Sequence, residues 1–163
     1  MGRIDRRIWR AVIFIAILAS TTGFDYSTKE WARSELTVHQ PRPVIEGFWD
    51  WELAFNDGAA FSSFRGSQVL LSLIALGALV MLGVMAHRTR PEQHLKRMAL
   101  AMIAGGALGN LIDRVRDGAV TDFVRWQAGG HTWPIFNVAD AALLVGVLML
   151  LVDGFLERRA VRA

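Results

Sequence analysis

The sequence lacks cysteine altogether and has one tyrosine and four prolines among its 163 residues. Without cysteine there is no disulfide, no thiol nucleophile and no Cys-ligated zinc or iron–sulfur cluster. Charged residues make up 20% of the chain, yet they are absent from residues 11–24, 66–86 and 98–112. Residues 126–152 carry a single charge, Asp140. This distribution excludes an intrinsically disordered chain, a disulfide-stabilised secreted domain and a two-domain soluble enzyme.

The uncharged stretches have lengths that suit membrane crossing. A transmembrane helix needs about 20 apolar residues, and 53% of the chain is hydrophobic. The first stretch follows several arginines, so a signal-peptide core is an alternative interpretation there. We expect one all-α membrane domain covering residues 1–163. Its four transmembrane helices are expected at residues 8–24, 67–86, 98–112 and 134–154, with outer loops at 25–66 and 113–133.

The distribution of charge predicts the orientation of the chain. Most of the 18 Lys and Arg residues lie in residues 3–10, 87–97 and 158–162, whereas most of the 15 acidic residues lie in the two longer loops. The positive-inside rule then places both termini in the cytoplasm and the longer loops outside. The net charge of +3 does not indicate nucleic-acid binding, because the basic residues flank apolar segments and form no stripe with interleaved aromatic residues.

Two segments of the outer loops have the pattern of β-strands. Tryptophan and other apolar residues occupy alternate positions from 49 to 55, which is the two-residue period of a strand. The Asn-Asp-Gly triplet at 56–58 supplies turn chemistry, and residues 120–126 have the composition of a second short strand. Tryptophans are favoured at membrane interfaces. We therefore expect a small β-sheet on the outer membrane surface.

The polar residues of the predicted helices and outer loops gather at one membrane level, near the outer face. Their side chains are the carboxylates, amides and cations that a catalytic or binding site uses. The candidate site residues are Asp25, Lys29, Asn56, Asn110, Asp113, Arg114, Asp122, Asn137 and Asp140.

Asp140 is the most informative of these residues, because it interrupts an apolar segment. An ionised carboxylate facing lipid costs several kcal/mol, so Asp140 should face protein or a wet cavity and mark a functional site. The structural alternative is a buried Asp140 that pairs with Arg114 or is capped by Asn137, one helical turn earlier.

Asp122 lies in a predicted loop, where an aspartate is usually solvated, but its neighbours are apolar. If Asp122 and Asp140 meet in a partly dry site, they cannot easily both ionise, and the pair shares a proton. Such a pair offers a base that activates water and an acid that protonates a carbonyl or a leaving amine.

Other polar and small residues have structural explanations beside the functional ones. Asp113 and Arg114 form a pair at a helix end that is more typical of an ion pair fixing helix packing. Ala101, Gly105 and Gly109 recur every four residues and allow close helix contact. The four histidines have no metal-ligand spacing, and there is no nucleotide motif. We expect neither a metal nor a cofactor.

Once these blocks are aligned, the whole chain resembles the lipoprotein signal peptidase (signal peptidase II) family of bacterial aspartyl peptidases. Tyr26 stands where that family often has Gln, and Ala141 stands where it commonly has Ser. Five blocks carry the resemblance, in the family's order: DYSTK at 25–29, NDGAAF at 56–61, GGALGNLIDR at 105–114, TDF at 121–123 and FNVAD at 136–140.

The resemblance implies that Asp122 and Asp140 are the catalytic pair. The supporting or substrate-binding residues would be Asp25, Lys29, Asn56, Gly58, Asn110, Asp113, Arg114 and Asn137. It also implies an enzyme of the bacterial cytoplasmic (inner) membrane, in contact with lipid, that removes signal peptides from diacylglyceryl-modified prolipoproteins by cutting just before the lipidated cysteine. We expect a monomer without a nucleic-acid partner.

Two other functions compete with this interpretation. A proton-coupled small transporter would use Asp140 as its relay carboxylate, but it predicts polar residues along the whole membrane depth, whereas the cytoplasmic halves of the segments are apolar. A non-enzymatic membrane scaffold would use Asp113, Arg114 and Asp140 as a structural network, and in that case replacing Asp140 would lower stability alone.

Overall fold

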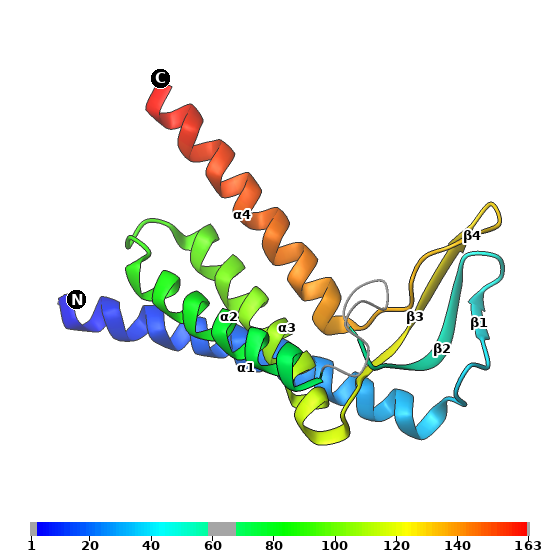
Figure 1. The fold of residues 1–163 in the computed structure, drawn as a ribbon. Coiled ribbons are helices and arrows are strands. Elements are labelled where there is room, and N and C mark those ends of the chain that lie inside the picture. Colours follow the sequence, from blue (N-terminus) through cyan, green and yellow to red (C-terminus); the bar gives the residue numbers. More distant parts are fainter. Residues whose placement is uncertain (1–2, 59–67, 163) are drawn as a thin grey trace.

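The structure, a computed structural model, describes residues 3–58 and 68–162 (Figure 1). Ala59, Ala60 and Phe61 of the second block, and the predicted helix start at residue 67, lie outside the described residues. The helices are α1 (Arg3–Glu35), α2 (Gln68–Arg88), α3 (His94–Asp117) and α4 (Val138–Arg162), and the strands are β1 (Arg42–Ile45), β2 (Trp49–Asn56), β3 (Val120–Ala128) and β4 (His131–Thr132).

The fold class predicted from the sequence is confirmed. Four helices in the described part of the chain are long and apolar enough to cross a membrane. Their apolar side chains point largely outward, as those of Val69 (76% exposed) and Leu151 (65% exposed) do. A lipid environment explains this arrangement, because acyl chains solvate leucine and valine as well as a protein core does.

Helices α1 and α3 extend beyond the predicted segments. Asp25 and Lys29, which we placed in the outer loop, belong to α1, and Arg114 belongs to α3. The reason is that hydropathy marks where charge begins, whereas a helix continues until its backbone is capped. Helix α3 ends when Gly118 adopts φ 73° and donates its N–H to the carbonyl oxygen of Arg114.

The predicted sheet is present and contains four antiparallel strands in the order β1-β2-β3-β4. In the β2–β3 pair, Ala54 lies opposite Asp122, beyond a register shift that begins at Trp51. Strand β3 also pairs with the segment before α4 through reciprocal backbone hydrogen bonds between Val124 and Phe136. This pairing brings the β3 residue Asp122 to the start of α4.

The predicted stripe of small residues on α3 does allow close helix contact. A Cβ added to Gly105 would lie 2.7 Å from Cβ of Thr21 on α1, and one added to Gly109 would lie 2.4 Å from Oδ2 of Asp25. On the other side of α3, a Cβ on Gly106 would lie 2.5 Å from a backbone oxygen at the start of α4. Glycine is therefore required for α3 to contact both α1 and α4.

The sheet lies at the end of the molecule where α1 and α3 finish and α4 begins (Figure 1). The N-terminus and the turn between α2 and α3 lie at the other end. All the polar candidate residues named above belong to the sheet end of the structure or to the helix turns beside it.

Candidate active site

Asn137 and Asp140 form a reciprocal cap at the start of α4. Oδ1 of Asn137 accepts the backbone N–H of Asp140 at 2.9 Å, and Oδ2 of Asp140 accepts the backbone N–H of Asn137 at 3.2 Å. This is the geometry of a capping box, which satisfies N–H groups that the helix leaves unpaired. The expected capping contact between Asn137 and Asp140 is therefore present, and it positions a half-buried carboxylate whose functional role stays a prediction.

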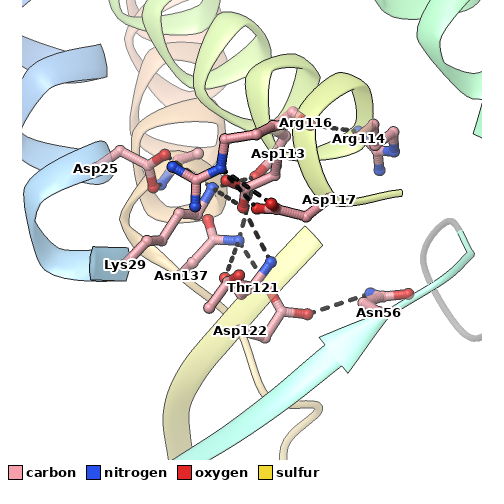
Figure 2. Close-up of polar contacts among 12 residues, drawn as sticks. Asp25, Lys29, Asn56, Asp113, Arg114, Arg116, Asp117, Thr121, Asp122 and Asn137 are labelled. Atoms are coloured by element: carbon pink, nitrogen blue, oxygen red, sulfur yellow. Dashed lines mark hydrogen bonds and ion pairs between the residues drawn. The ribbon is translucent and has the colours of Figure 1, made fainter. Parts of the chain in front are cut away.

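Asp122 is 3% exposed and lies beside this cap. Nδ2 of Asn137 donates to Oδ1 of Asp122 at 2.7 Å, and Nδ2 of Asn56 donates to the other oxygen at 3.2 Å (Figure 2). The N–H of Gly58 in turn donates to Oδ1 of Asn56 at 3.0 Å, which directs the Asn56 amide nitrogen toward Asp122. Asn137 thus contacts both carboxylates that we predicted to be a pair.

The environment of Asp122 favours the protonated acid. Burial, followed by the negative charge of Asp140, raises the pKa of Asp122 to about 7, although the amide hydrogen bonds from Asn56 and Asn137 act in the opposite direction. A carboxyl group that is half protonated near neutral pH, beside a second carboxylate, can exchange protons in either direction.

Asn110 connects this pair to a buried cation. Its Oδ1 accepts from Nζ of Lys29 at 2.9 Å and from Nδ2 of Asn137 at 3.2 Å. Its Nδ2 donates to Oδ1 of Asp140 at 2.9 Å. Because the Lys29 ammonium can only donate, the amide oxygen of Asn110 must face it, and the amide nitrogen must then face Asp140.

Lys29 is fully buried, and its ammonium group lies close to three side-chain oxygens. Besides Asn110, its Nζ lies 2.8 Å from Oδ2 of Asp25 and 3.1 Å from Oδ2 of Asp113 (Figure 2). The other oxygen of Asp25 accepts the backbone N–H of Ala139 at 2.8 Å. Asp25 therefore caps α4 from α1, and Lys29 offsets the charge of two buried carboxylates that would otherwise be costly.

Sequence reasoning missed Arg33, which extends this cluster. Its Nη2 lies 2.9 Å from Oδ1 of Asp113, and its Nε donates to Oγ1 of Thr121 at 3.0 Å. The backbone N–H of Thr121 donates to Oδ2 of Asp113 at 3.0 Å. Asp25, Lys29 and Arg33 are four residues apart, which places them on one face of a helix. That spacing indicates that Arg33 lies on the same helix face as Asp25 and Lys29, but the predicted helix ended before residue 33.

The expected ion pair between Asp113 and Arg114 is wrong. Neighbouring residues of a helix point about 100° apart, so Asp113 faces α1 while Arg114 faces α2. Arg114 donates to the carbonyl oxygen of Asn110 at 3.4 Å and lines a cavity of about 500 Å³ between α2 and α3 with Val69, Leu73 and other apolar side chains.

Tyr26 lies on the outside of this cluster. Nη1 of Arg116 donates to its hydroxyl oxygen at 3.1 Å, and the guanidinium lies 5.5 Å from the ring centroid. The same arginine pairs with Glu30 at 2.7 Å.

In residues 3–58 and 68–162, there is no group of three or more His, Asp or Glu side chains placed to hold a metal ion.

Comparison with known proteins identifies the family of this chain. A solved structure titled a bacterial membrane enzyme has a TM-score of 0.84 and 28% identity, and it covers 93% of this chain and 92% of its own. The lipoprotein signal peptidase of Xanthomonas axonopodis pv. citri is 39% identical over 91% of this chain and 88% of its own length. That of Xylella fastidiosa is 38% identical over 85% of both chains. A model of the family described as Signal peptidase (SPase) II matches residues 15–156, and the chain belongs to this family of membrane peptidases.

Proposed function

We propose that this peptidase is an aspartyl endopeptidase that removes signal peptides from diacylglyceryl-modified prolipoproteins, cutting the bond just before the lipidated cysteine. Family membership supports the removal of signal peptides from lipoproteins. The observation that carries the aspartyl mechanism is the position of Asn137, which hydrogen bonds to both Asp122 and Asp140 and so holds two carboxyl groups at one place.

Hydrolysis by this pair divides the two roles between an ionised and a protonated carboxyl group. The ionised group takes a proton from water as the water oxygen attacks the carbonyl carbon of the scissile peptide bond. The protonated group gives its proton to the carbonyl oxygen, and the tetrahedral species then collapses with transfer of a proton to the leaving amine. The raised pKa of Asp122 supplies a protonated group near neutral pH, and the two groups act as a unit.

The position of the pair suits a substrate anchored in lipid. The carboxylates lie where the apolar helices meet the sheet, so a bond close to a lipid anchor reaches them at the membrane surface. The apolar cavity between α2 and α3, next to Arg114, can receive an acyl chain. Strand β1 is exposed along its length and can pair with an extended peptide through its main chain.

The proposal also includes the location and orientation of the enzyme. Basic residues concentrate at the end of the molecule away from the sheet, which supports cytoplasmic termini and an active site at the outer face of the bacterial inner membrane. We propose a monomer, with lipidated precursors as its substrates and membrane lipid as its environment.

The test uses single replacements of the two carboxylates in the membrane-embedded enzyme. A purified diacylglyceryl-modified precursor is incubated with Asp122→Asn, Asp140→Asn and Asp153→Asn, and mass spectrometry measures the loss of the signal peptide. Asp153 is the control because it lies at the opposite end of α4 from Asp140. We expect processing only by the control. Normal processing by either folded active-site variant would overturn the assignment.

A further inference from the structure

A second cavity with many basic lining residues lies at the end of the molecule away from the sheet and from the candidate active site. The N-terminal part of α1, the end of α2 and the connection between α2 and α3 line an open cavity of about 570 Å³. No carboxylate is found among its described lining residues. The basic side chains that line it are Arg7, Arg10, His87, Arg88, Arg90 and Arg97.

Arg97 differs from an ordinary membrane-flanking arginine. It is only 6% exposed, and Nη2 of its guanidinium donates to the carbonyl oxygen of Arg90 at 2.9 Å. Arg10 brings a second positive charge close to it, and Glu92 partly offsets this repulsion. The positive-inside rule requires only that such residues reach water. A buried guanidinium with five N–H groups beside like charges is instead stabilised by an anion that accepts several hydrogen bonds.

An apolar groove adjoins the basic cavity. This second cavity, of about 460 Å³, shares Arg10 and Arg97 with the first. Its other lining residues are mainly apolar ones, such as Ile13, Ile17 and Met98, together with Glu92 and His94. A cavity with an arginine cluster at one end and an apolar groove between two membrane helices is complementary to an amphiphile with an anionic head and a hydrocarbon tail.

We propose that these two cavities bind one anionic phospholipid. Its phosphodiester accepts hydrogen bonds from Arg97 and Arg10, and one acyl chain lies in the groove between α1 and α3. The charge of the lipid offsets the repulsion among the arginines. The bound lipid joins α1 to the connection between α2 and α3, at the membrane surface opposite the peptidase site.

The experiment measures lipid binding directly. The detergent-solubilised full chain is titrated with micelles containing phosphatidylglycerol, with otherwise identical micelles containing phosphatidylcholine, or with inorganic phosphate. Native mass spectrometry counts bound lipid, and thermal unfolding reports stabilisation. We expect phosphatidylglycerol alone to bind and raise the unfolding temperature. Equal stabilisation by phosphatidylcholine would contradict the need for an anionic head group. Equal stabilisation by inorganic phosphate at the same concentration would contradict the need for a lipid.

Matched variants locate the binding site. Arg97→Gln and Arg10→Gln should each bind phosphatidylglycerol about tenfold more weakly, because each loses a charge-assisted hydrogen bond. Arg97→Lys, which keeps the charge, should retain most of the binding. Arg158→Gln removes the same charge from exposed α4 outside both cavities and should bind as the unaltered chain does. Equal losses in Arg158→Gln and Arg97→Gln, or no loss in Arg97→Gln and Arg10→Gln, would overturn the proposal.

Discussion

The side chain of Asn137 donates a 2.7 Å hydrogen bond to Asp122, from a position where the same residue also caps the helix that carries Asp140. One residue therefore has two separable tasks: it begins α4, and it holds the carboxylate of β3. Serine caps a helix about as well as asparagine does, but its side chain has no N–H donor and its hydroxyl group is shorter than the asparagine amide.

This separation predicts different effects for two variants of Asn137. Asn137→Ala should lower the free energy of unfolding by about 1 kcal/mol, because the helix cap is lost. It should also lower the processing rate about tenfold or more, because the hydrogen bond to Asp122 is lost. Asn137→Ser should keep the stability and still lose the rate. Thermal unfolding and initial rates of precursor cleavage measure the two effects. Normal rates in Asn137→Ser would show that the amide of residue 137 does not act on Asp122.

The raised pKa of Asp122, about 7, predicts how stability depends on pH. Between the unfolded pKa near 4 and the folded pKa near 7, the native state binds the proton more tightly than the unfolded state does. Stability from this group is therefore fully present below pH 4 and is lost as pH rises toward 7. Asp122→Asn has no such group, so it should unfold at a higher temperature than the unaltered chain at pH 8 and lose that advantage at pH 4.

The comparison between the two chains removes the titration of Asp122, together with its coupling to Asp140, and leaves the other titratable side chains in place. Unfolding temperatures measured from pH 4 to 8 in one detergent provide the test. A difference that stays constant across this range would contradict the raised pKa. The same titration predicts that processing by the unaltered enzyme declines above pH 7, as the shared proton is lost.

Arg33 is expected to act on catalysis by positioning the residue before Asp122. Its hydrogen bond to Thr121 and ion pair with Asp113 join β3 to α1 and α3. Arg33→Gln should lower kcat about tenfold, the cost of a charged hydrogen bond, with little change in KM. Arg33→Lys should retain part of the rate, because a lysine can still form an ion pair with Asp113. Arg158→Gln is the control. An unchanged kcat in folded Arg33→Gln would contradict this role.

Two glycines in the membrane helices test the close contact between α1 and α3. Gly109→Ala would place a Cβ 2.4 Å from Oδ2 of Asp25, so it should destabilise the chain by about 1–3 kcal/mol through overpacking. Gly77→Ala, on α2, meets nothing within 4 Å and should be neutral or slightly stabilising. Thermal unfolding in the same detergent compares them. Equal stability of the two variants would show that α1 moves aside without cost.

The sequence alone was sufficient to predict the features that follow from periodicity and hydropathy. Uncharged stretches predict four helices, and alternation from residue 49 predicts strand β2, because both patterns reflect which face of an element meets an apolar environment. Asp140 could be recognised because an isolated charge in an apolar segment is costly.

Other features depend on partners that are distant in the sequence. Arg33 became a site residue because α1 continues past the first charged residues, and its partners Asp113 and Thr121 come from elements about 80 residues later. The direction of Arg114 likewise follows from which neighbouring helix each face of α3 meets. No local pattern reports these contacts, because tertiary packing decides them.

The hydrogen bond from Ala139 to Asp25 joins residues 114 positions apart, from the first helix to the last. The order of biosynthesis therefore controls when the enzyme becomes competent. A nascent chain that has emerged as far as β3 already contains Asp122, Lys29 and Asn110, but it lacks both Asp140 and the helix end that Asp25 caps. If Asp122 and Asp140 act together as proposed, proteolytic activity requires insertion of the fourth helix, and we expect incompletely inserted chains to be inactive.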